Sequence, residues 1–424
     1  MWFDTTTVKR IIQSPSTNQV ARLFAVNLVS IPLGIIVSIF LTRLLGVEDY
    51  GNYQFINSIF TFAITFLTFG FLQATSRALV LNYSPVRAKQ YYGTTLIILG
   101  GIFVLMSVAL LLYGLLDENL QSKNIQSIFL LAIPVSSIFL LMSYFETLLQ
   151  ADNQIKLLSQ SRLMPKILFG IVVTVIYFYF KDTEYEKLKL VFLIFFITQL
   201  IAYLYLIQKL KVSFSFFRSR LKEIWIYNKK FGFDVYLGSL FALGFSSLIQ
   251  ILIGYFSADN SGVGYFALAL TFSMPLSIIP NIIATTHYKN FAQSNSVSAK
   301  LLFITIGLSI LGLFTVWILV PPMVNHFYGK EYRPVIQINL IVSVAVLIHG
   351  FGDFFNRFLG ANGQGKALRN SAFYVGGSLM VGSVLLIPKF GEYGAAYAKL
   401  LAGVVYLSVI IYYYLKFIRA KKKK

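Results

Sequence analysis

The chain of 424 residues is 57% hydrophobic and only 12% charged, and its mean hydropathy is +0.72. A soluble domain carries about 25% charged residues, so this composition excludes an ordinary soluble fold and indicates a membrane protein. Cysteine is absent and the three histidines are far apart in the sequence, which argues against disulfides, thiolate chemistry and a metal site.

The first predicted element is a membrane-spanning helix. Residues 1–22 are mostly polar, and the apolar run after them has no small-residue cleavage site, so we expect no cleavable signal peptide. Apolar stretches of about 17 to 25 residues then recur along the chain. They predict an all-α integral membrane protein with about twelve transmembrane helices, at 23–42, 53–76, 91–116, 124–145, 163–180, 190–207, 235–257, 262–286, 301–324, 335–352, 371–387 and 393–415.

The basic residues alternate from one side of these helices to the other. Of the 36 Lys and Arg residues, 27 fall in both termini and every second loop, whereas 8 fall in the remaining loops. The positive-inside rule therefore predicts that both termini are cytoplasmic. The net charge of +20 is explained by this asymmetry and by contact with anionic membrane phospholipids, so nucleic-acid binding is not predicted.

An internal repeat relates the two halves of the chain. Phe145–Ser161 and Phe355–Ser371 share seven identities in seventeen positions at a shift of 210 residues, and Gly51-Asn-Tyr is echoed by Gly264-Tyr-Phe. Secondary transporters are commonly built from such repeats, with the substrate path between them. The sequence thus predicts two parallel six-helix bundles around a central cavity, with boundaries at 1–207, 208–230 (a basic cytoplasmic linker) and 231–424.

The same repeat bears on a glycine-rich segment, Gly360–Lys366. The segment fits a phosphate-binding loop until Ala367, which stands where Ser or Thr would hold magnesium. No predicted strand precedes it, and the first copy of the repeat lacks the glycines. We therefore expect a cytoplasmic turn between two helices, and no nucleotide or other cofactor.

Polar side chains recur every three or four residues along spans 1, 2, 7 and 8, which places them on one face of each helix. Small polar residues also pack helices together, and this alternative is favoured for any single Ser or Thr. Large amides are costlier in lipid and point more strongly to a wet interior. The candidates for lining a substrate cavity are Asn27, Ser38, Asn57, Thr61, Thr65, Gln250 and Asn281.

Charged residues near the predicted spans are few. Asp234 is the one acid placed clearly inside a predicted span, where it serves either an interfacial pair with Lys230 or ion coupling. Arg22 and Arg77 flank spans 1 and 2 on the cytoplasmic side. They act either as topology anchors or as contacts for a diphosphate or another anionic head group. Lys399 is expected to extend outward to the interface.

Six short motifs are distributed over most of the chain. They are Leu41–Gly46, Glu48–Tyr53, Phe69-Gly70, Ala74–Arg77, Gly262–Ala269 and Ile387–Ala398. Together they resemble the polysaccharide-transport branch of the multidrug/oligosaccharidyl-lipid/polysaccharide exporter superfamily, which contains the O-antigen flippases. One feature departs from the pattern. Members often have an acidic–basic pair in span 7, where this chain has Gln250-Ile251, so the resemblance implies no coupling role at that point.

The resemblance implies a flippase that moves an undecaprenyl-diphosphate-linked oligosaccharide across the bacterial inner membrane by alternating access. The oligosaccharide would be a repeat unit of O-antigen or of another surface polysaccharide, and a polymerase and a chain-length regulator are implied as partners. One alternative is an exporter of drugs or small metabolites with the same fold. A second is a membrane polysaccharide polymerase or glycosyltransferase, but the predicted outward loops are too short to hold a catalytic site.

Overall fold

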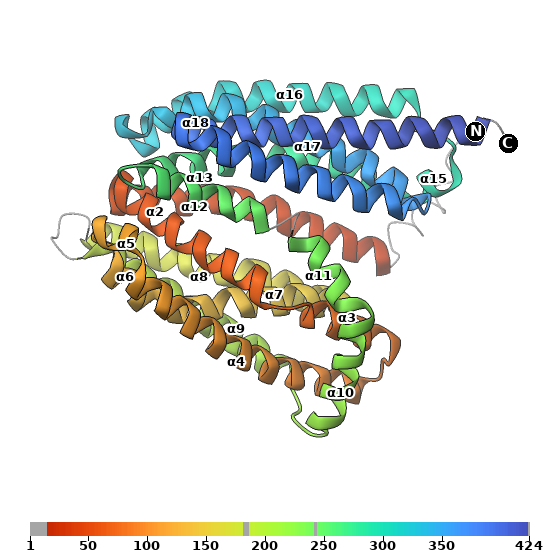
Figure 1. The fold of residues 1–424 in the computed structure, drawn as a ribbon, viewed down its shortest axis with the longest axis horizontal. Helices are drawn as coiled ribbons and strands as arrows, with labels where there is room; N and C mark the ends of the chain where they lie inside the picture. Colours follow the sequence, from red (N-terminus) through yellow and green to blue (C-terminus); the bar gives the residue numbers. More distant parts are fainter. Residues whose placement is uncertain (1–14, 181–185, 241–243, 423–424) are drawn as a thin grey trace. The chain divides into compact units, whose positions relative to one another are not determined.

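The computed structural model describes residues 15–180, 186–240 and 244–422, without the side chains of 15–24 and 27. Every regular element in these ranges is helical (Figure 1), which confirms the all-α fold class. The elements are α2 (Pro15–Leu67), α3 (Phe71–Leu81), α4 (Pro85–Leu116), α5 (Glu118–Ser122), α6 (Gln126–Ala132), η1 (Ile133–Val135), α7 (Ser136–Ala151), α8 (Ile155–Phe180), α9 (Lys187–Leu210), α10 (Phe217–Tyr227), η2 (Asn228–Gly232), α11 (Phe233–Ser239), α12 (Phe245–Phe256), α13 (Ser261–Ser273), α14 (Pro275–Thr286), α15 (Tyr288–Gln293), α16 (Ala299–Met323), η4 (Val324–Tyr328), η5 (Lys330–Tyr332), α17 (Pro334–Ala361) and α18 (Gly365–Lys422).

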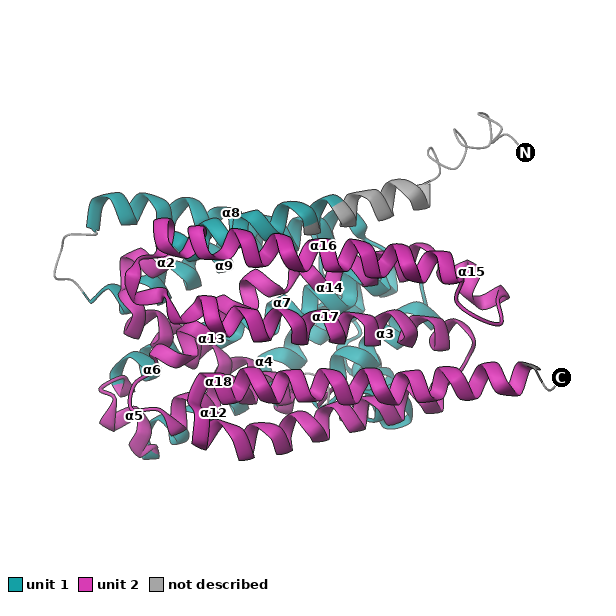
Figure 2. Cartoon of the chain, turned by 90° about the horizontal axis from the view of Figure 1, so that it is seen from above, with its two compact units in different colours: residues 1–40, 67–116, 127–236 teal, residues 41–66, 117–126, 237–424 magenta. Residues whose placement is uncertain are grey.

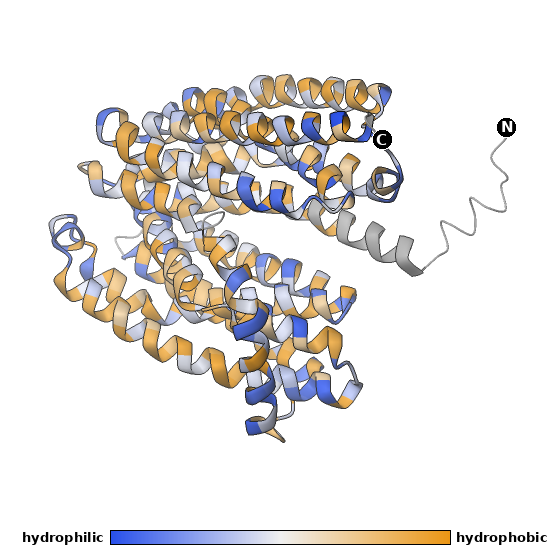
Figure 3. Cartoon of the chain, turned by 45° about the vertical axis from the view of Figure 1, so that its right-hand side comes forward, coloured by the Kyte–Doolittle hydropathy of each residue, from blue (hydrophilic) through white to orange (hydrophobic). Residues whose placement is uncertain are grey.

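Nine helical segments among the described residues are long and apolar enough to cross a membrane. Hydrophobic residues cover most of their length, and hydrophilic residues gather toward helix ends and turns (Figure 3). Two of the helices, α2 with 53 residues and α18 with 58, are far longer than one crossing requires. Twelve crossings are accommodated when α2 and α18 each cross twice and α11 and α12 together cross once, and this count remains a prediction.

A glycine interrupts each of the two long helices. Gly46 in α2 has φ 77° and ψ −177°, and Gly391 in α18 has φ 55° and ψ −132°. Residues with a Cβ rarely adopt a positive φ, whereas glycine does so at little cost. Both glycines lie within the segments that carried the family resemblance. The kinks divide α2 and α18 near the boundaries predicted between spans 1 and 2 and between spans 11 and 12.

The two copies of the repeat form the same turn. Asn153 (φ 54°) in the first copy and Gly363 (φ 71°) in the second both adopt the left-handed conformation between two helices. Their backbone hydrogen bonds also correspond at the shift of 210 residues. The N–H groups of Asp152, Asn153 and Gln154 donate to the carbonyls of Leu148, Gln150 and Leu149, and those of Asn362, Gly363 and Gln364 donate to Phe358, Gly360 and Leu359. Gly360–Lys366 is therefore a helix–turn–helix connection, as the sequence predicts, and not a phosphate-binding loop.

The segments group into two compact units (Figure 2). Unit 1 contains residues 1–40, 67–116 and 127–236, and unit 2 contains 41–66, 117–126 and 237–424. The division follows packing, so the second part of α2 groups with C-terminal helices. The sequence-based boundaries at 207 and 231 describe the repeat and remain a prediction.

Buried tyrosines organise the core of unit 1. Tyr92 on α4 and Tyr144 on α7 lie with their ring centroids 6.3 Å apart. The Tyr144 hydroxyl donates to the Tyr92 carbonyl at 3.2 Å, and the Tyr92 hydroxyl donates to Asp152 Oδ2 at 2.6 Å. Each buried hydroxyl is thus satisfied inside the protein, as an apolar surrounding requires.

In unit 2, α17 packs against α13, α14 and α18. Asn339 of α17 donates to Ser273 Oγ at 2.9 Å and to the Ala269 carbonyl at 3.2 Å, both on α13. A second close contact joins α2 to α13, where a Cβ added at Gly264 would lie 3.3 Å from Gly51 Cα. The glycines that marked the repeat in the sequence therefore lie at a helix crossing, which their lack of side chains permits.

The short segment 117–126 is held in unit 2 by Lys123. Its ammonium donates to the Gly254 carbonyl and, at 3.0 Å, to Asn260 Oδ1. Asn260 Nδ2 in turn donates to Asn52 Oδ1 at 2.7 Å. Burial lowers the pKa of Lys123, and the nearby carboxylate of Asp259 opposes this effect. The hydrogen bonds offset the cost of burying the charge.

The close approach at Gly51 predicts a loss of stability when a methyl group is added. A Cβ at Gly51 would overlap the Asn260 carbonyl oxygen, a backbone atom that cannot rotate away. We expect Gly51→Ala to lower the free energy of unfolding by about 1–3 kcal/mol, measured as thermal unfolding in detergent by tryptophan fluorescence. Gly377→Ala is the control, because no atom lies within 4 Å of its added Cβ. Equal stability of the two variants would contradict the close crossing.

Candidate functional site

A polar cavity of about 460 Å³ lies inside unit 2. It is lined by Ser246 of α12, by α14 and α17, and by two stretches of α18, the first near Val375 and the second from Lys399 to Tyr406. Many hydrogen-bonding side chains line it, although the surrounding helices are apolar. Its polar side chains include Ser277, His349, Asp353, Asn356, Lys399 and Tyr406.

Asp353 is the centre of this cavity. Its Oδ1 accepts a hydrogen bond from the Tyr406 hydroxyl at 3.0 Å, and its Oδ2 accepts one from Asn281 Nδ2 at 3.3 Å. Asn281 Oδ1 accepts a hydrogen bond from Arg357 Nε at 3.1 Å. Three helices, α14, α17 and α18, thus hold a half-buried carboxylate between a hydroxyl and an amide.

Two further ionisable groups accompany Asp353. The imidazole of His349 lies one turn before Asp353 on α17, with its ring centroid 4.8 Å from that of Tyr406. Lys399 lies two turns before Tyr406 on α18 and also lines the cavity. Among the described residues, the Lys399 ammonium forms no ion pair or hydrogen bond. The expectation that Lys399 extends outward is therefore wrong, because its side chain faces the polar cavity.

Helical spacing explains how the sequence builds this site. His349, Asp353 and Arg357 follow one another at intervals of four residues, which places them along one face of α17. The tenth span was predicted to end at 352, whereas the candidate span in the structure continues to Ala361. Asp353 therefore lies on the same continuous helix as the predicted tenth span, one residue beyond its predicted end. The four-residue spacing was the signal that could have revealed it.

The group can act chemically in two ways. Carboxylate, amide, hydroxyl and ammonium groups together supply donors and acceptors that suit the hydroxyls of a sugar. A carboxylate in the same cavity as a free ammonium can also take up and release a proton or a cation. The described residues contain no group of three or more His, Cys, Asp or Glu side chains that is arranged to hold a metal ion.

The predicted cavity residues are placed differently from one another. Asn281 belongs to the Asp353 site. Ser38, Thr61 and Thr65 donate their hydroxyl hydrogens to carbonyls of their own helix, those of Ile35, Asn57 and Thr61, at 2.8 Å in each case. This geometry agrees with the helix-packing alternative and does not by itself indicate a substrate path.

The other amide residues predicted to line the cavity are Asn57, Gln250 and Asn27, and neither Asn57 nor Gln250 lines the Asp353 site. The Asn57 amide is hydrogen-bonded to the Tyr53 side chain, and its buried Oδ1 has no hydrogen-bond partner among the described residues. Gln250 is half-buried on α12. The side chain of Asn27 lies outside the described residues, as does that of Arg22.

The two other charged candidates are exposed. Arg77 on α3 lies with its guanidinium 5.5 Å from the centre of the Phe231 ring. Asp234 occupies the first turn of α11 and, within the described ranges, forms no ion pair with Lys230. The structure does not bring either residue to the Asp353 site.

Comparison with known proteins shows which family the chain belongs to. Residues 16–293 match the family described as "Polysaccharide biosynthesis protein". The chain belongs to this family. Over 398 residues it is 23% identical to the capsular polysaccharide biosynthesis protein CapF of Staphylococcus aureus, with 92% of this chain and 97% of CapF covered.

Solved structures show which fold the family member has. The lipid II flippase MurJ in an inward closed conformation is similar with a TM-score of 0.71 at 16% identity, covering 93% of this chain and 89% of that one. An inward-facing multidrug resistance MATE family transporter of the MOP superfamily gives 0.64 at 13% identity, covering 96% and 99%. The family member thus shares its fold with these membrane transporters. Together with the family match, this fold confirms the resemblance to the polysaccharide-transport branch of the exporter superfamily.

The Asp353 site yields a prediction about stability. Asp353→Ala leaves the Tyr406 hydroxyl without its acceptor, and such a loss costs about 1–3 kcal/mol. The Asn281 amide keeps a second acceptor, the Ser277 carbonyl at 3.0 Å. We expect the double variant Asp353→Ala/Tyr406→Phe to lose less than the sum of the two single variants, because they remove the same hydrogen bond. Thermal unfolding of the four proteins measures this coupling. Strict additivity would show that the two side chains do not interact.

Proposed function

We propose that this family member is a flippase for an undecaprenyl-diphosphate-linked oligosaccharide, which it moves from the cytoplasmic to the periplasmic leaflet of the bacterial inner membrane. The family match over residues 16–293 carries the proposal. The likeness to CapF and the fold shared with a lipid II flippase support it. The transported sugar is a repeat unit of O-antigen, capsule or another surface polysaccharide.

The polar cavity of unit 2 supplies a physical basis for this function. An oligosaccharide needs hydrogen-bonding partners to cross an apolar region, whereas its lipid tail can stay in the bilayer. Asp353, Asn281 and Tyr406 offer such partners to sugar hydroxyls. In the proposal, the halves 1–207 and 231–424 rock about a central wet path, so that this path opens to each side in turn. Both termini then face the cytoplasm.

The other predicted residues keep their roles as parts of the proposal. Arg22 and Arg77 bind the diphosphate at the cytoplasmic end of the transport path. Basic residues on that side also set the orientation of the helices in the membrane. Asp234 is the sequence-based candidate for ion coupling, and the geometry adds Asp353 as a second candidate. A polysaccharide polymerase and a chain-length regulator are the proposed partners. The central path would be lined by Asn27, Ser38, Asn57, Thr61, Thr65, Gln250 and Asn281.

A second candidate function is export of drugs or small metabolites. The observation that favours it is the shared fold with multidrug transporters, together with an acid inside unit 2. A deletion strain separates the two functions. Loss of surface polysaccharide, with lipid-linked oligosaccharide accumulating in the inner leaflet, supports the flippase. Normal polysaccharide with increased drug sensitivity would support the exporter instead.

The role of Asp353 in transport can be tested by removing its charge. Asp353→Asn keeps the size of the side chain but removes its charge and replaces one acceptor oxygen by a donor. We expect surface polysaccharide in a complemented deletion strain to fall at least tenfold, with protein level unchanged. Glu118→Gln, an exposed acid on α5, is the matched control and should export normally. Equal export by the two variants would remove Asp353 from the transport path.

The cytoplasmic arginines have their own test. Neutralising both in Arg22→Gln/Arg77→Gln should impair export, because a diphosphate is held best by guanidinium groups. Protein level and the position of both termini, measured with reporter fusions, should not change. Export at the wild-type level would leave these two residues as topology anchors only.

A further inference from the structure

The amphipathic helix α10 borders an apolar groove of about 620 Å³ in unit 1. The floor of the groove is formed by Phe71 of α3 and by Ile97 and Gly101 of α4, and α10 contributes Trp225 to its wall. Ile97 and Trp225 remain more than two-fifths exposed, at 43% and 48%. The groove is therefore an open apolar surface and not part of the packed core.

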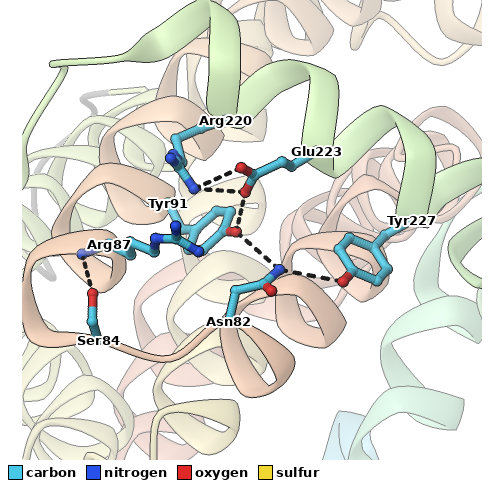
Figure 4. A network of polar contacts seen from close by, with 7 residues as sticks. All are labelled: Asn82, Ser84, Arg87, Tyr91, Arg220, Glu223 and Tyr227. Atoms are coloured by element: carbon cyan, nitrogen blue, oxygen red, sulfur yellow. Dashed lines mark hydrogen bonds and ion pairs between the residues drawn. The ribbon is translucent and has the colours of Figure 1, made fainter.

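The opposite side of α10 is fixed by a polar network (Figure 4). Arg220 donates to both oxygens of Glu223 at 2.8 and 2.7 Å, and the Tyr91 hydroxyl of α4 donates to the same carboxylate. Asn82 Nδ2 donates to the Tyr227 hydroxyl at 3.2 Å. These contacts hold α10 in one orientation against α3 and α4.

Two cations stand on the face of α10 that borders the groove. Arg218 and Lys222 are four residues apart, so both side chains project from the same face of the helix. Both are exposed, and within 15–180, 186–240 and 244–422 neither forms an ion pair. No acidic residue lines the groove. Their positive charges are thus available to an anion at the edge of an apolar surface.

This combination matches the chemistry of a phospholipid. A phosphate accepts hydrogen bonds from a guanidinium and an ammonium, and a hydrocarbon chain gains free energy on an apolar floor. Tryptophan is enriched at the level of the head groups, and basic amphipathic helices lie in that plane. We propose that the groove holds one anionic phospholipid, with its phosphate between Arg218 and Lys222 and one acyl chain along Phe71, Ile97 and Gly101.

Charge complementarity distinguishes this site from general attraction to a membrane. Each cation near an anionic surface strengthens binding roughly fivefold wherever it stands. Arg218 and Lys222 add to this an adjacent apolar floor that can hold an acyl chain. The lipid would tie α10, which connects α9 to α11 along the chain, to the bilayer. This inference does not depend on the identity of the transported substrate.

The first experiment removes the charges. Purified protein is titrated in detergent with phosphatidylglycerol or with phosphatidylcholine of the same acyl chains, and native mass spectrometry counts bound lipid. We expect wild-type protein to retain one phosphatidylglycerol, and Arg218→Gln/Lys222→Gln to weaken that binding at least tenfold. Lys156→Gln/Lys366→Gln is the control: it removes two exposed lysines from the repeated turns and should bind as wild type. Equal weakening in both variants would overturn the proposal in favour of unspecific attraction.

The second experiment fills the groove without changing charge. A Cβ at Gly101 or at its neighbour Gly100 meets no atom within 4 Å, so both positions accept a side chain. Only Gly101 lines the groove. We expect Gly101→Leu to lose the bound phosphatidylglycerol and Gly100→Leu to keep it. Retention by Gly101→Leu would overturn the site. Tighter binding of a polyprenyl diphosphate than of phosphatidylglycerol would overturn the assigned occupant and point to the transported lipid.

Discussion

A polar group inside an apolar helix bundle must find its partner within the bundle, and this requirement sorts the polar residues of the chain. Thr61 and Thr65 satisfy their hydroxyls on their own helix, so they need nothing from a neighbour. Asp353 cannot do this, and it draws Tyr406 and Asn281 from two other helices. Such partners across helices fix how helices pack, and they also concentrate chemistry at one place. The cavity of unit 2 surrounds these contacts of Asp353 with Tyr406 and Asn281.

The features of the fold that could be predicted from the sequence are those that depend on local patterns of residues. Long apolar runs predicted helices, and the repeat predicted the shared turn at Asn153 and Gly363, because a left-handed residue between two helices is a local property. Gly46 and Gly391 lay in the resembling segments, but the continuous helices on either side of their kinks were not foreseen. Hydropathy averages over a window, so it locates a span better than it locates its ends or its bends.

The candidate site could be predicted only in part for the same reason. Asn281 was identified from its amide, whereas Asp353 was not considered because it lies one residue beyond the predicted end of the tenth span. Its partners lie 72 and 53 positions away in the chain, at Asn281 and Tyr406, and no single-span pattern contains them. Lys399 was misjudged because its counterpart in the repeat, Lys189, lies at a helix end, where a lysine commonly extends to water. Which way it points is decided by the facing helix, α17, and that is tertiary information.

In the proposed transport, the distribution of charge separates the binding of the sugar from the binding of the diphosphate. The cavity of unit 2 is lined by one carboxylate, that of Asp353, and by one ammonium, that of Lys399. A diphosphate entering it would gain from the lysine but face repulsion from the aspartate, whereas neutral sugar hydroxyls can use both groups as acceptor and donor. The basic residues, by contrast, concentrate in the loops predicted to be cytoplasmic. The same charge distribution therefore favours sugar in the cavity and diphosphate near the basic face, which is the arrangement a lipid-linked oligosaccharide presents when its tail stays in the bilayer.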